Sequence, residues 1–314
     1  LCPMGIILLR IVNVKLGEIR KQKNPVVACI GYFDGMHKGH QALVNATIEK
    51  AKELGVESGL ITFDPDPWVT LRNAKDVKHI TPLQQRMNLA VELGIKNIFI
   101  LNFTKEMAAL SPLDFIKVLD SCNIKALICG FDYHYGQFGK GDIESLKRDA
   151  DFEVVVIDAV SDNEGKISST RITNLIEEGE VHKAEELLGY AYRVEGYVVH
   201  GNAKGRTIGY PTANVSVPSE YLEPKGGVYA CFALIDGKKY EAMVNIGHNP
   251  TFNYTETMSL EAYILDFSGD LYDKRLKISF KYYLRPEKKF KYIGNLKMQL
   301  EQDEFAVRTL LREG

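Results

Sequence analysis

The chain has 314 residues, which is long for one compact unit and suits two, since domains commonly run about 100 to 200 residues. Hydrophobic residues make up 45% and charged residues 25%, a balance that excludes disordered, collagen-like and disulfide-scaffold proteins. Lysine and arginine number 39 against 41 acidic residues, so the net charge of −2 provides no field for a polyanion, and we expect neither nucleic acid nor a membrane surface as a partner.

The five cysteines are an odd number, and no two of them form a Cys-x-x-Cys pair. We interpret them as small buried apolar residues in a reducing compartment. No apolar run approaches the roughly 20 residues of a membrane span, so we expect a cytoplasmic protein. The sequence leaves the oligomeric state open.

In the first part of the chain, short apolar runs alternate with helical patterns that end at glycine. This alternation predicts parallel βαβ units and therefore a doubly wound α/β sheet, whose ligands bind beyond the carboxyl ends of the strands. The expected strands are 26–30, 59–63, 97–101, 126–129 and 153–157, and the expected helices are 43–54, 83–93 and 113–119.

The second part has a different composition, because 13 of the 16 tyrosines lie at Tyr190 or later. Short runs rich in Val, Ile, Tyr and Phe predict an antiparallel barrel or sandwich, followed by a helix after Pro286 that caps it. We place the domains at 1–186 and 187–314. The expected strands of the second domain are 193–200, 227–235, 240–246, 259–266 and 276–283.

A glycine-rich turn over residues 31–40 follows the first of these strands and opens the first helix. Gly31 and Gly39 allow the backbone to approach a ligand closely, and a helix N-terminus offers free N–H groups to a phosphate. His37 and His40 lie three residues apart and can both point at one phosphate chain. A single histidine usually packs or caps, whereas two in such a turn favour phosphate chemistry.

This His-x-Gly-His turn resembles the signature of the nucleotidylyltransferase superfamily, and its longer form is similar to the adenylyltransferase domain of bacterial FAD synthetases. Residues 167–172 resemble the Ser-Ser-Thr element that starts a late helix there, although alone such a segment is an ordinary helix cap. The resemblance implies that FMN attacks the α-phosphorus of ATP while His37, His40 and Arg171 stabilise charge. The implied ATP contacts are Gly31, Phe33, Gly39, Ser168, Ser169, Thr170 and Arg171.

Several positions differ from the family's pattern. Asp66 stands where histidine is usual in a Thr-Phe-x-Pro-His-Pro loop, His134 replaces arginine in a loop resembling Gly-x-Asn-Phe-Arg-Phe-Gly, and Thr173 stands where arginine is frequent. Each change removes a potential cation or donor from a polyphosphate site. Asp132, in the second of these loops, replaces asparagine, and the resemblance implies that it contacts the flavin.

A second glycine-rich run, residues 201–214, follows the strand that ends at His200. Its glycines can wrap phosphates, and Thr212 and Asn214, two residues apart in an extended segment, point to the same side as hard oxygen ligands for Mg²⁺. The run is similar to the Gly-x-x-x-Gly-Arg-x-x-Gly-x-Pro-Thr-Ala-Asn signature of riboflavin kinases. The resemblance implies that ATP is bound by Gly201, Lys204, Gly205, Arg206, Thr212 and Asn214.

Further segments match this family in order, including those that contain Asn245, Glu261 and Arg285. The resemblance implies that Glu261 is the general base at the flavin hydroxyl and that Asn245 and Arg285 belong to the flavin site. A lone glutamate in a strand is usually solvated, so the ordered set of motifs decides this interpretation.

Both motif sets occur in the order seen in bifunctional bacterial riboflavin kinase/FAD synthetases. We therefore predict an enzyme that phosphorylates riboflavin to FMN with ATP and Mg²⁺ and adenylylates FMN to FAD with a second ATP. Two alternatives stay open: a riboflavin kinase whose first domain is a weak or redirected nucleotidylyltransferase, and a flavin sensor without turnover. A sensor needs neither a base nor Mg²⁺ ligands, which argues against the second.

Overall fold

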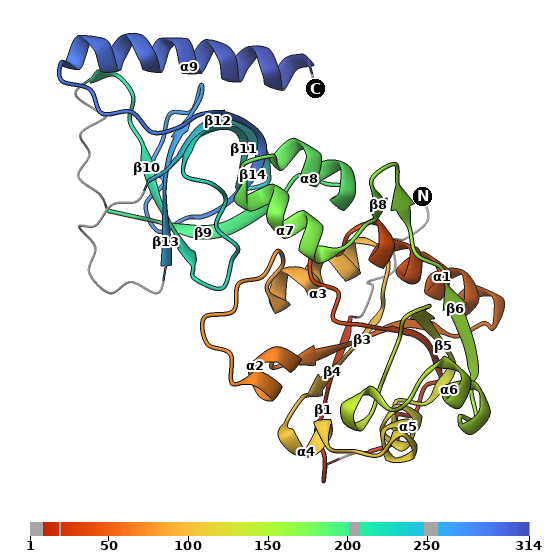
Figure 1. The fold of residues 1–314 in the computed structure, drawn as a ribbon. Helices are drawn as coiled ribbons and strands as arrows, with labels where there is room; N and C mark the ends of the chain where they lie inside the picture. Colours follow the sequence, from red (N-terminus) through yellow and green to blue (C-terminus); the bar gives the residue numbers. More distant parts are fainter. Residues whose placement is uncertain (1–8, 19, 201–207, 248–256, 314) are drawn as a thin grey trace. The chain divides into compact units, whose positions relative to one another are not determined.

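The structure is a computed structural model that describes residues 9–18, 20–200, 208–247 and 257–313. The chain divides into two compact units (Figure 1). The first comprises residues 1–77 and 81–168, and the second comprises residues 78–80 and 169–314. Within the described residues, no helix combines the length and the apolar character that crossing a membrane requires.

A six-stranded parallel sheet organises the first unit. Strand β2 (Val26–Ile30) is buried along its whole length, as expected where helices cover both faces of a sheet. The strand order is β1-β4-β3-β2-β5-β6, so the order reverses between β2 and β5, where open α/β sheets bind ligands. The other strands are β1 (Arg10–Val14), β3 (Glu57–Asp64), β4 (Asn97–Asn102), β5 (Ile124–Gly130) and β6 (Glu153–Ile157).

The expected doubly wound sheet is confirmed, and all five expected strands are present as β2 to β6. Strand β1 was not expected. Among the described strands it pairs only with β4, and half-buried and exposed positions alternate along it until the buried Val14, so it lacks the continuous apolar run that marks the central strands. The remaining elements of this unit are α1 (Lys38–Glu53), α2 (Pro67–Arg72), α3 (Leu83–Glu92), α4 (Lys105–Ala108), α5 (Pro112–Ser121), η1 (Gln137–Gly139), α6 (Ile143–Asp149), β7 (Ser161–Asp162) and β8 (Gly165–Lys166).

The second unit is a closed antiparallel barrel with the strand order β10-β13-β12-β11-β14-β9, in which β9 also pairs with β10. The expected barrel and its C-terminal helix are confirmed. The strands are β9 (Arg193–Val199), β10 (Ala213–Pro218), β11 (Gly227–Ile235), β12 (Lys238–Ile246), β13 (Thr257–Ile264) and β14 (Arg275–Arg285), and the helices are α7 (Ser169–Glu177), α8 (Val181–Leu188) and α9 (Ile293–Glu313).

Helix α9 covers part of the outer face of the barrel (Figure 1). Along β11, Tyr229, Cys231 and Ala233 are buried at every second position and fill the barrel. Val228 and Ala230 point the other way and form an apolar cluster with Val307 and Leu311 of α9 and several neighbours. The barrel therefore has two apolar layers, one inside it and one beneath α9.

The second unit begins earlier than the expected boundary at residue 187. Helix α8 packs against β14, where the Lys281 ammonium lies 2.6 Å from the Glu185 carboxylate. Residues 78–80 also belong to this unit, because the His79 N–H donates to the Glu220 carbonyl at 2.8 Å and its carbonyl accepts from Leu222 N–H. The tyrosine-rich composition starts only after α8, so it marks the beginning of the barrel and leaves out the two helices that pack with it.

Candidate functional sites

Four of the predicted site residues lie in one row across neighbouring strands of the barrel. Glu261 on β13 is paired in register with Asn214 on β10 and with Asn245 on β12. Val228 on β11 then pairs with Asn245 on one side and with Arg285 on β14 on the other. Residues directly opposite each other point to the same face of a sheet, so the register gathers side chains that lie up to 71 positions apart in the sequence.

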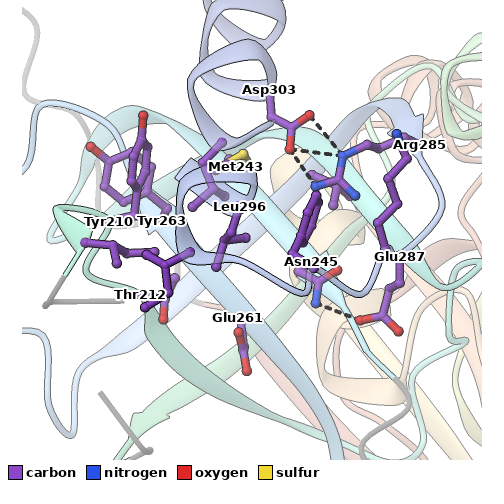
Figure 2. A pocket seen from close by; sticks show the side chains of 16 residues that line it. Tyr210, Thr212, Met243, Asn245, Glu261, Tyr263, Arg285, Glu287, Leu296 and Asp303 are labelled. Carbon is purple, nitrogen blue, oxygen red and sulfur yellow. Dashed lines mark hydrogen bonds and ion pairs between the residues drawn. The ribbon is translucent and has the colours of Figure 1, made fainter. Parts of the chain in front are cut away.

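Glu261, Asn245 and Arg285 of this row line a cavity of about 530 Å³ between the barrel and α9 (Figure 2). Such a volume is in the range of small-molecule sites, which are mostly apolar with a few polar groups. Met243 and Leu296 lie between the Tyr210–Tyr263 pair and the Arg285 side chain in Figure 2. The lining residues are Ile208, Tyr210, Thr212, Val228, Met243, Asn245, Glu261, Tyr263, Arg285, Glu287, Lys288, Phe290, Ile293, Leu296, Leu300 and Asp303.

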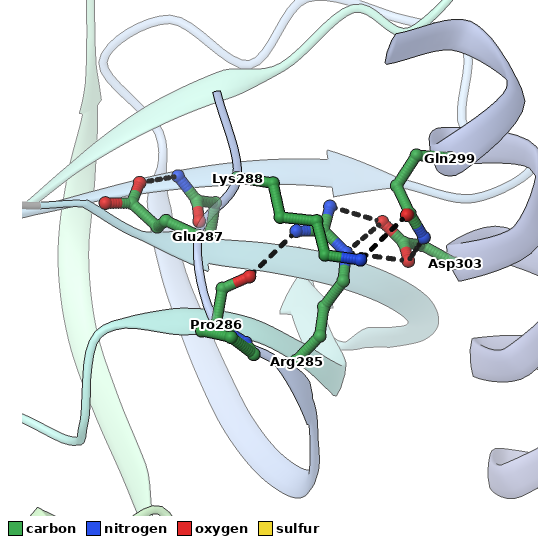
Figure 3. A network of polar contacts seen from close by, with 7 residues as sticks. Arg285, Pro286, Glu287, Lys288, Gln299 and Asp303 are labelled. Atoms are coloured by element: carbon green, nitrogen blue, oxygen red, sulfur yellow. Dashed lines mark hydrogen bonds and ion pairs between the residues drawn. The ribbon is translucent and has the colours of Figure 1, made fainter. Parts of the chain in front are cut away.

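A buried ion pair between Arg285 and Asp303 lines the cavity, and Figure 3 shows the polar contacts around it. The Arg285 guanidinium donates to the Asp303 carboxylate through Nε at 3.0 Å and Nη2 at 2.6 Å, and its Nη1 donates to the Pro286 carbonyl at 3.0 Å. Gln299 also donates to Asp303 at 2.9 Å and accepts from Lys288 at 3.3 Å. The network fixes the end of β14 and the following segment to α9.

The sequence did not single out Asp303, because it reads as one more acid on a helix. A signal was present in its spacing, since Asp303 lies between the apolar positions Leu300 and Val307 on the face that packs on the barrel. A charged residue at an apolar position of a helix indicates a buried partner. Structure alone identifies that partner as Arg285.

A second hollow, of about 110 Å³, lies on the other side of Thr212, which lines both spaces. Its other lining residues are Val198, Pro211, Ala213, Ala262, Ile264, Phe267, Gly269, Asp270, Leu271 and Tyr272. A ligand in each hollow would therefore meet the other at Thr212. On the side of the larger cavity, the Asn245 amide donates to the Glu287 carboxylate at 3.0 Å.

The oxygen donors at this junction suit Mg²⁺, which binds through a few protein oxygens together with substrate phosphates. Thr212 supplies a hydroxyl, Asn214 a carbonyl, and Glu261 lies opposite Asn214 in register. Among the described residues, no group of three or more His, Cys, Asp or Glu side chains is placed to hold a metal ion. The predicted ATP contacts Gly201, Lys204, Gly205 and Arg206 lie outside the described residues.

In the first unit, the His-x-Gly-His turn leaves β2 and enters α1, at the expected edge of the sheet. His37 is the N-cap of α1, and its Nδ1 accepts from the His40 N–H at 3.4 Å. The two imidazole rings stack with centroids 3.7 Å apart, and the Phe33 ring meets His40 edge-on at 5.3 Å. Phe33 is fully buried, so it supports the His40 ring from within the protein. Gly31 lies against the same Phe33 ring.

Both histidines are uncharged at neutral pH. Burial lowers the pKa of His37 to about 4, and the Lys166 ammonium adds to this effect. Burial also lowers the pKa of His40 well below its usual value, with further contributions from His37, Arg86 and Lys166. Because the His37 Nδ1 accepts a hydrogen bond, the proton of its neutral ring is on Nε2, which can donate to a ligand.

Asp132 lies just beyond the carboxyl end of β5, across the topological reversal from the histidines. Its carboxylate forms an ion pair with Lys166 at 2.5 Å, and the Lys166 ammonium also lies 4.8 Å from the centre of the Phe131 ring. Lys166 in turn acts on both histidines. His134 is exposed, and its Nδ1 lies 3.0 Å from the Asp132 carbonyl.

Asp66 occupies the position where the family usually has histidine, and its side chain is buried. It is the N-cap of α2, where its carboxylate accepts from the Trp68 N–H at 2.6 Å. It also hydrogen-bonds to the Tyr32 side chain, which together with burial raises the pKa of that phenol. The carboxylate is therefore bound to protein donors.

The Ser-Ser-Thr segment spans the division between the units. Ser168 is the last residue of the first unit. Its neighbour Ile167 lies close to the histidine turn, because the Ile167 carbonyl oxygen is 3.9 Å from the point where a side chain at Gly39 would place its Cβ. Ser169, Thr170 and Arg171 belong to the second unit and begin α7, as the sequence predicted for a late helix.

Two protein-family models match the chain. A model described as FAD synthetase matches residues 19–171, and a model described as riboflavin kinase matches residues 188–311. The first match covers the unit with the two histidines, and the second covers the barrel and α9.

Curated relatives match over nearly their whole length. A bifunctional riboflavin kinase/FMN adenylyltransferase from Listeria monocytogenes is 41% identical over 90% of this chain and 91% of its own. A protein of the same name from Bacillus subtilis is 36% identical over 91% of this chain and 92% of its own.

One solved structure is similar over both units. It is a crystal structure described as a macrolide-efflux protein from Streptococcus pneumoniae, with a TM-score of 0.89 and 34% identity over 96% of this chain and 99% of that one. The likeness concerns the fold. With both family models and the relatives matching in the same order, the chain belongs to the family of bifunctional riboflavin kinase/FMN adenylyltransferases.

Proposed function

We propose that this chain phosphorylates riboflavin in the barrel unit and adenylylates the resulting FMN in the α/β unit. The observation that carries the first reaction is that Glu261, Asn245 and Arg285 line one cavity beneath α9, with Asn214 paired in register to Glu261 on the neighbouring strand. The cavity has an apolar wall for the flavin ring. Its polar rim suits the ribityl chain.

Phosphoryl transfer follows from the position of Glu261. Its carboxylate takes the proton of the riboflavin 5′-hydroxyl as that oxygen attacks the γ-phosphorus of ATP. The bond from the γ-phosphorus to the β–γ bridging oxygen breaks, ADP leaves, and the proton passes from Glu261 to solvent. Positioning and electrostatic stabilisation supply most of the rate in such transfers.

ATP reaches this reaction from the side of the smaller hollow, since Thr212 lines both spaces. The Thr212 hydroxyl and the Asn214 carbonyl would hold Mg²⁺, which neutralises phosphate charge when it is bound with ATP. The glycine-rich run with Gly201, Gly205 and Arg206 completes the proposed ATP site. Arg285 and Asn245 hold the flavin, and the Asp303 and Glu287 carboxylates orient them.

In the α/β unit, an FMN phosphate oxygen attacks the α-phosphorus of ATP and pyrophosphate leaves. The neutral His37 ring donates from Nε2 to the phosphate chain, and the N–H groups at the start of α1 add their dipoles. On the basis of the family resemblance, we assign Asp132 as a contact of the flavin. On the same basis, we assign residues Ser168 to Arg171 as contacts of the triphosphate. No covalent intermediate is required.

The position of Asp66 supports retention of this second reaction. A free carboxylate in a phosphate site would repel the ligand, but this carboxylate accepts hydrogen bonds from Trp68 and Tyr32. Lys166 provides a cation close to both histidines. We also expect both reactions in the cytoplasm, in keeping with the free, buried cysteines Cys29, Cys122, Cys129 and Cys231.

One assay tests both activities. The chain is incubated with riboflavin, ATP and Mg²⁺, and riboflavin, FMN and FAD are separated over time; a second reaction starts from FMN. We expect FMN to appear first and FAD to follow. In the second reaction, His40→Ala should cost about 2 to 4 kcal/mol of transition-state stabilisation, as for one preorganised donor, and should leave riboflavin phosphorylation unchanged. A parent chain that forms no FAD, with activity restored by Asp66→His, would show that the adenylyltransferase has been lost.

A further inference from the structure

A buried arginine lies behind the histidine turn of the first unit. Arg86, the fourth residue of α3, is only 2% exposed and is the largest of the fully buried side chains among the described residues. Its Nη1 donates to the Thr62 hydroxyl and its Nη2 to the Thr81 carbonyl, both at 3.3 Å, and the guanidinium lies 4.2 Å from the centre of the Tyr32 ring. Its Nε is buried and has no hydrogen-bond partner among the described residues.

The partners of Arg86 are neutral. No carboxylate of the described residues lies within the 4.0 Å of an ion pair, and Asp66 reaches this group through the Tyr32 side chain. Burying a charge without an opposite charge beside it is costly. A charged residue that is buried without a salt bridge lowers the stability of the fold, and such a residue is a candidate for a functional role.

Arg86 is linked to the histidine turn at two places. The first link runs through Thr81, whose carbonyl accepts a hydrogen bond from Arg86. Thr81 in turn contacts the start of the turn: its N–H donates to the Asp34 carboxylate at 2.8 Å, and its hydroxyl accepts from the Gly35 N–H at 2.7 Å. Arg86 also acts directly on His40, whose pKa it lowers. Like Arg86 Nε, the His40 Nδ1 is buried without a hydrogen-bond partner among the described residues.

The charged and titratable groups that act on His40 are His37 on the same turn, Arg86 on α3 and Lys166 on β8. None of them is an acid. The positive charges of Arg86 and Lys166 therefore raise the electrostatic potential at the His40 ring. A positive potential disfavours the protonated imidazolium and favours a bound anion beside the ring. Arg86 differs from Lys166 because burial protects its field from salt, whereas Lys166 is half exposed and already paired with Asp132.

We propose that Arg86 is a positioning residue of the adenylyltransferase site, whose buried permanent charge sets the electrostatic potential of the His37–His40 turn without touching the substrate. This proposal rests on the proposed adenylyltransferase function. It assigns to neutral histidines the role of hydrogen-bond donors and to Arg86 the role of the cation that attracts the phosphate chain. The guanidinium also orients the turn through Thr81.

The test compares Arg86→Gln and Arg86→Lys with the parent, using Arg148→Gln as a control that removes one exposed charge from the same unit. Two quantities are measured: kcat/KM for adenylylation of FMN from about pH 5 to about pH 9, and the titration of His40 by NMR. Riboflavin phosphorylation by the same chain controls for concentration. Fluorescence of Trp68, the only tryptophan, reports folding of the first unit.

We expect Arg86→Gln to lower kcat/KM for adenylylation about 10- to 100-fold, equivalent to a change of one to two pKa units in the stabilisation of charge, and to move the His40 titration to higher pH. Arg86→Lys should keep the His40 titration near that of the parent and retain adenylylation within about 5-fold, because it preserves the charge. Arg148→Gln should change neither quantity.

Two results would overturn the proposal. One is a His40 titration that does not move in Arg86→Gln, and the other is an Arg86→Lys chain that folds but loses as much activity as the glutamine variant, which would make the role one of shape. If Arg86→Gln does not fold, the lysine variant still decides by its activity and titration. The NMR readout also stands apart from turnover, so a parent without FAD synthesis would refute the proposed function and leave the electrostatic test intact.

Discussion

Removal of the Asp303 carboxylate gives a sharp test of the cavity in the barrel unit. The side chains of Arg285 and Asp303 are 13% and 5% exposed, and the Arg285 Nε and Nη2 donate to the carboxylate at distances between 2.6 and 3.0 Å. In Asp303→Ala, the guanidinium stays buried without a counter-charge. Breaking such a pair costs about 3 to 5 kcal/mol, and since neither partner is a third exposed, the discount for solvent screening is small.

The two units carry different spectroscopic probes, which makes this loss measurable. Trp68 lies in the first unit, whereas 13 of the 16 tyrosines lie at Tyr190 or later. In urea, the near-ultraviolet circular dichroism of the tyrosines should show earlier unfolding of the barrel unit in Asp303→Ala, and Trp68 fluorescence should change little. We also expect the KM for riboflavin to rise, because Arg285 lines the cavity, while adenylylation of supplied FMN continues.

Two further variants separate the ion pair from the helix that carries it. Glu301→Ala removes an exposed acid from the same helix and should leave both stability and kinase activity within experimental error. The double variant Arg285→Met/Asp303→Leu replaces both partners by apolar groups and should recover most of the stability, but not riboflavin binding. A loss below about 1 kcal/mol in Asp303→Ala, with the KM unchanged, would refute the reasoning.

Three other predictions address the remaining parts of the chain. Glu261→Gln should slow riboflavin phosphorylation on the order of 10² to 10⁴-fold, as for loss of a general base, and leave the conversion of FMN to FAD unchanged; kinase activity within a few-fold of the parent would remove Glu261 from the mechanism. His37 has a folded-state pKa of about 4 against an unfolded value near 6.5, so its contribution to stability should be lost as the pH falls through this window; urea titrations at several pH values should show a weaker dependence in His37→Gln. A fragment of residues 169–314 should fold and phosphorylate riboflavin, whereas one of residues 187–314 should be less stable because it lacks α8, which packs on β14; equal thermal stability of the two would contradict this.

The sequence alone determined the two kinds of fold and the positions of the motifs. Continuous apolar runs such as Val26–Ile30 identified buried parallel strands, because a strand covered on both faces has no polar side. The glycines and histidines of residues 31–40 indicated a phosphate site for a similar local reason, since a strand, a turn and a helix start follow one another in the chain. Strand β1 was not predicted because an edge strand has a weaker hydrophobic pattern than a central one.

Only the tertiary structure decided which distant residues meet and which charges are buried. The row from Asn214 through Glu261 to Arg285 depends on the register of a closed barrel, and the pairing of strands far apart in sequence is set by packing as a whole. The ionic environment of a side chain is likewise a property of its neighbours: Asp66 becomes a helix cap, and Arg86 becomes a buried cation among neutral partners. A residue's type states which charge it can carry, whereas the fold determines what that charge acts on.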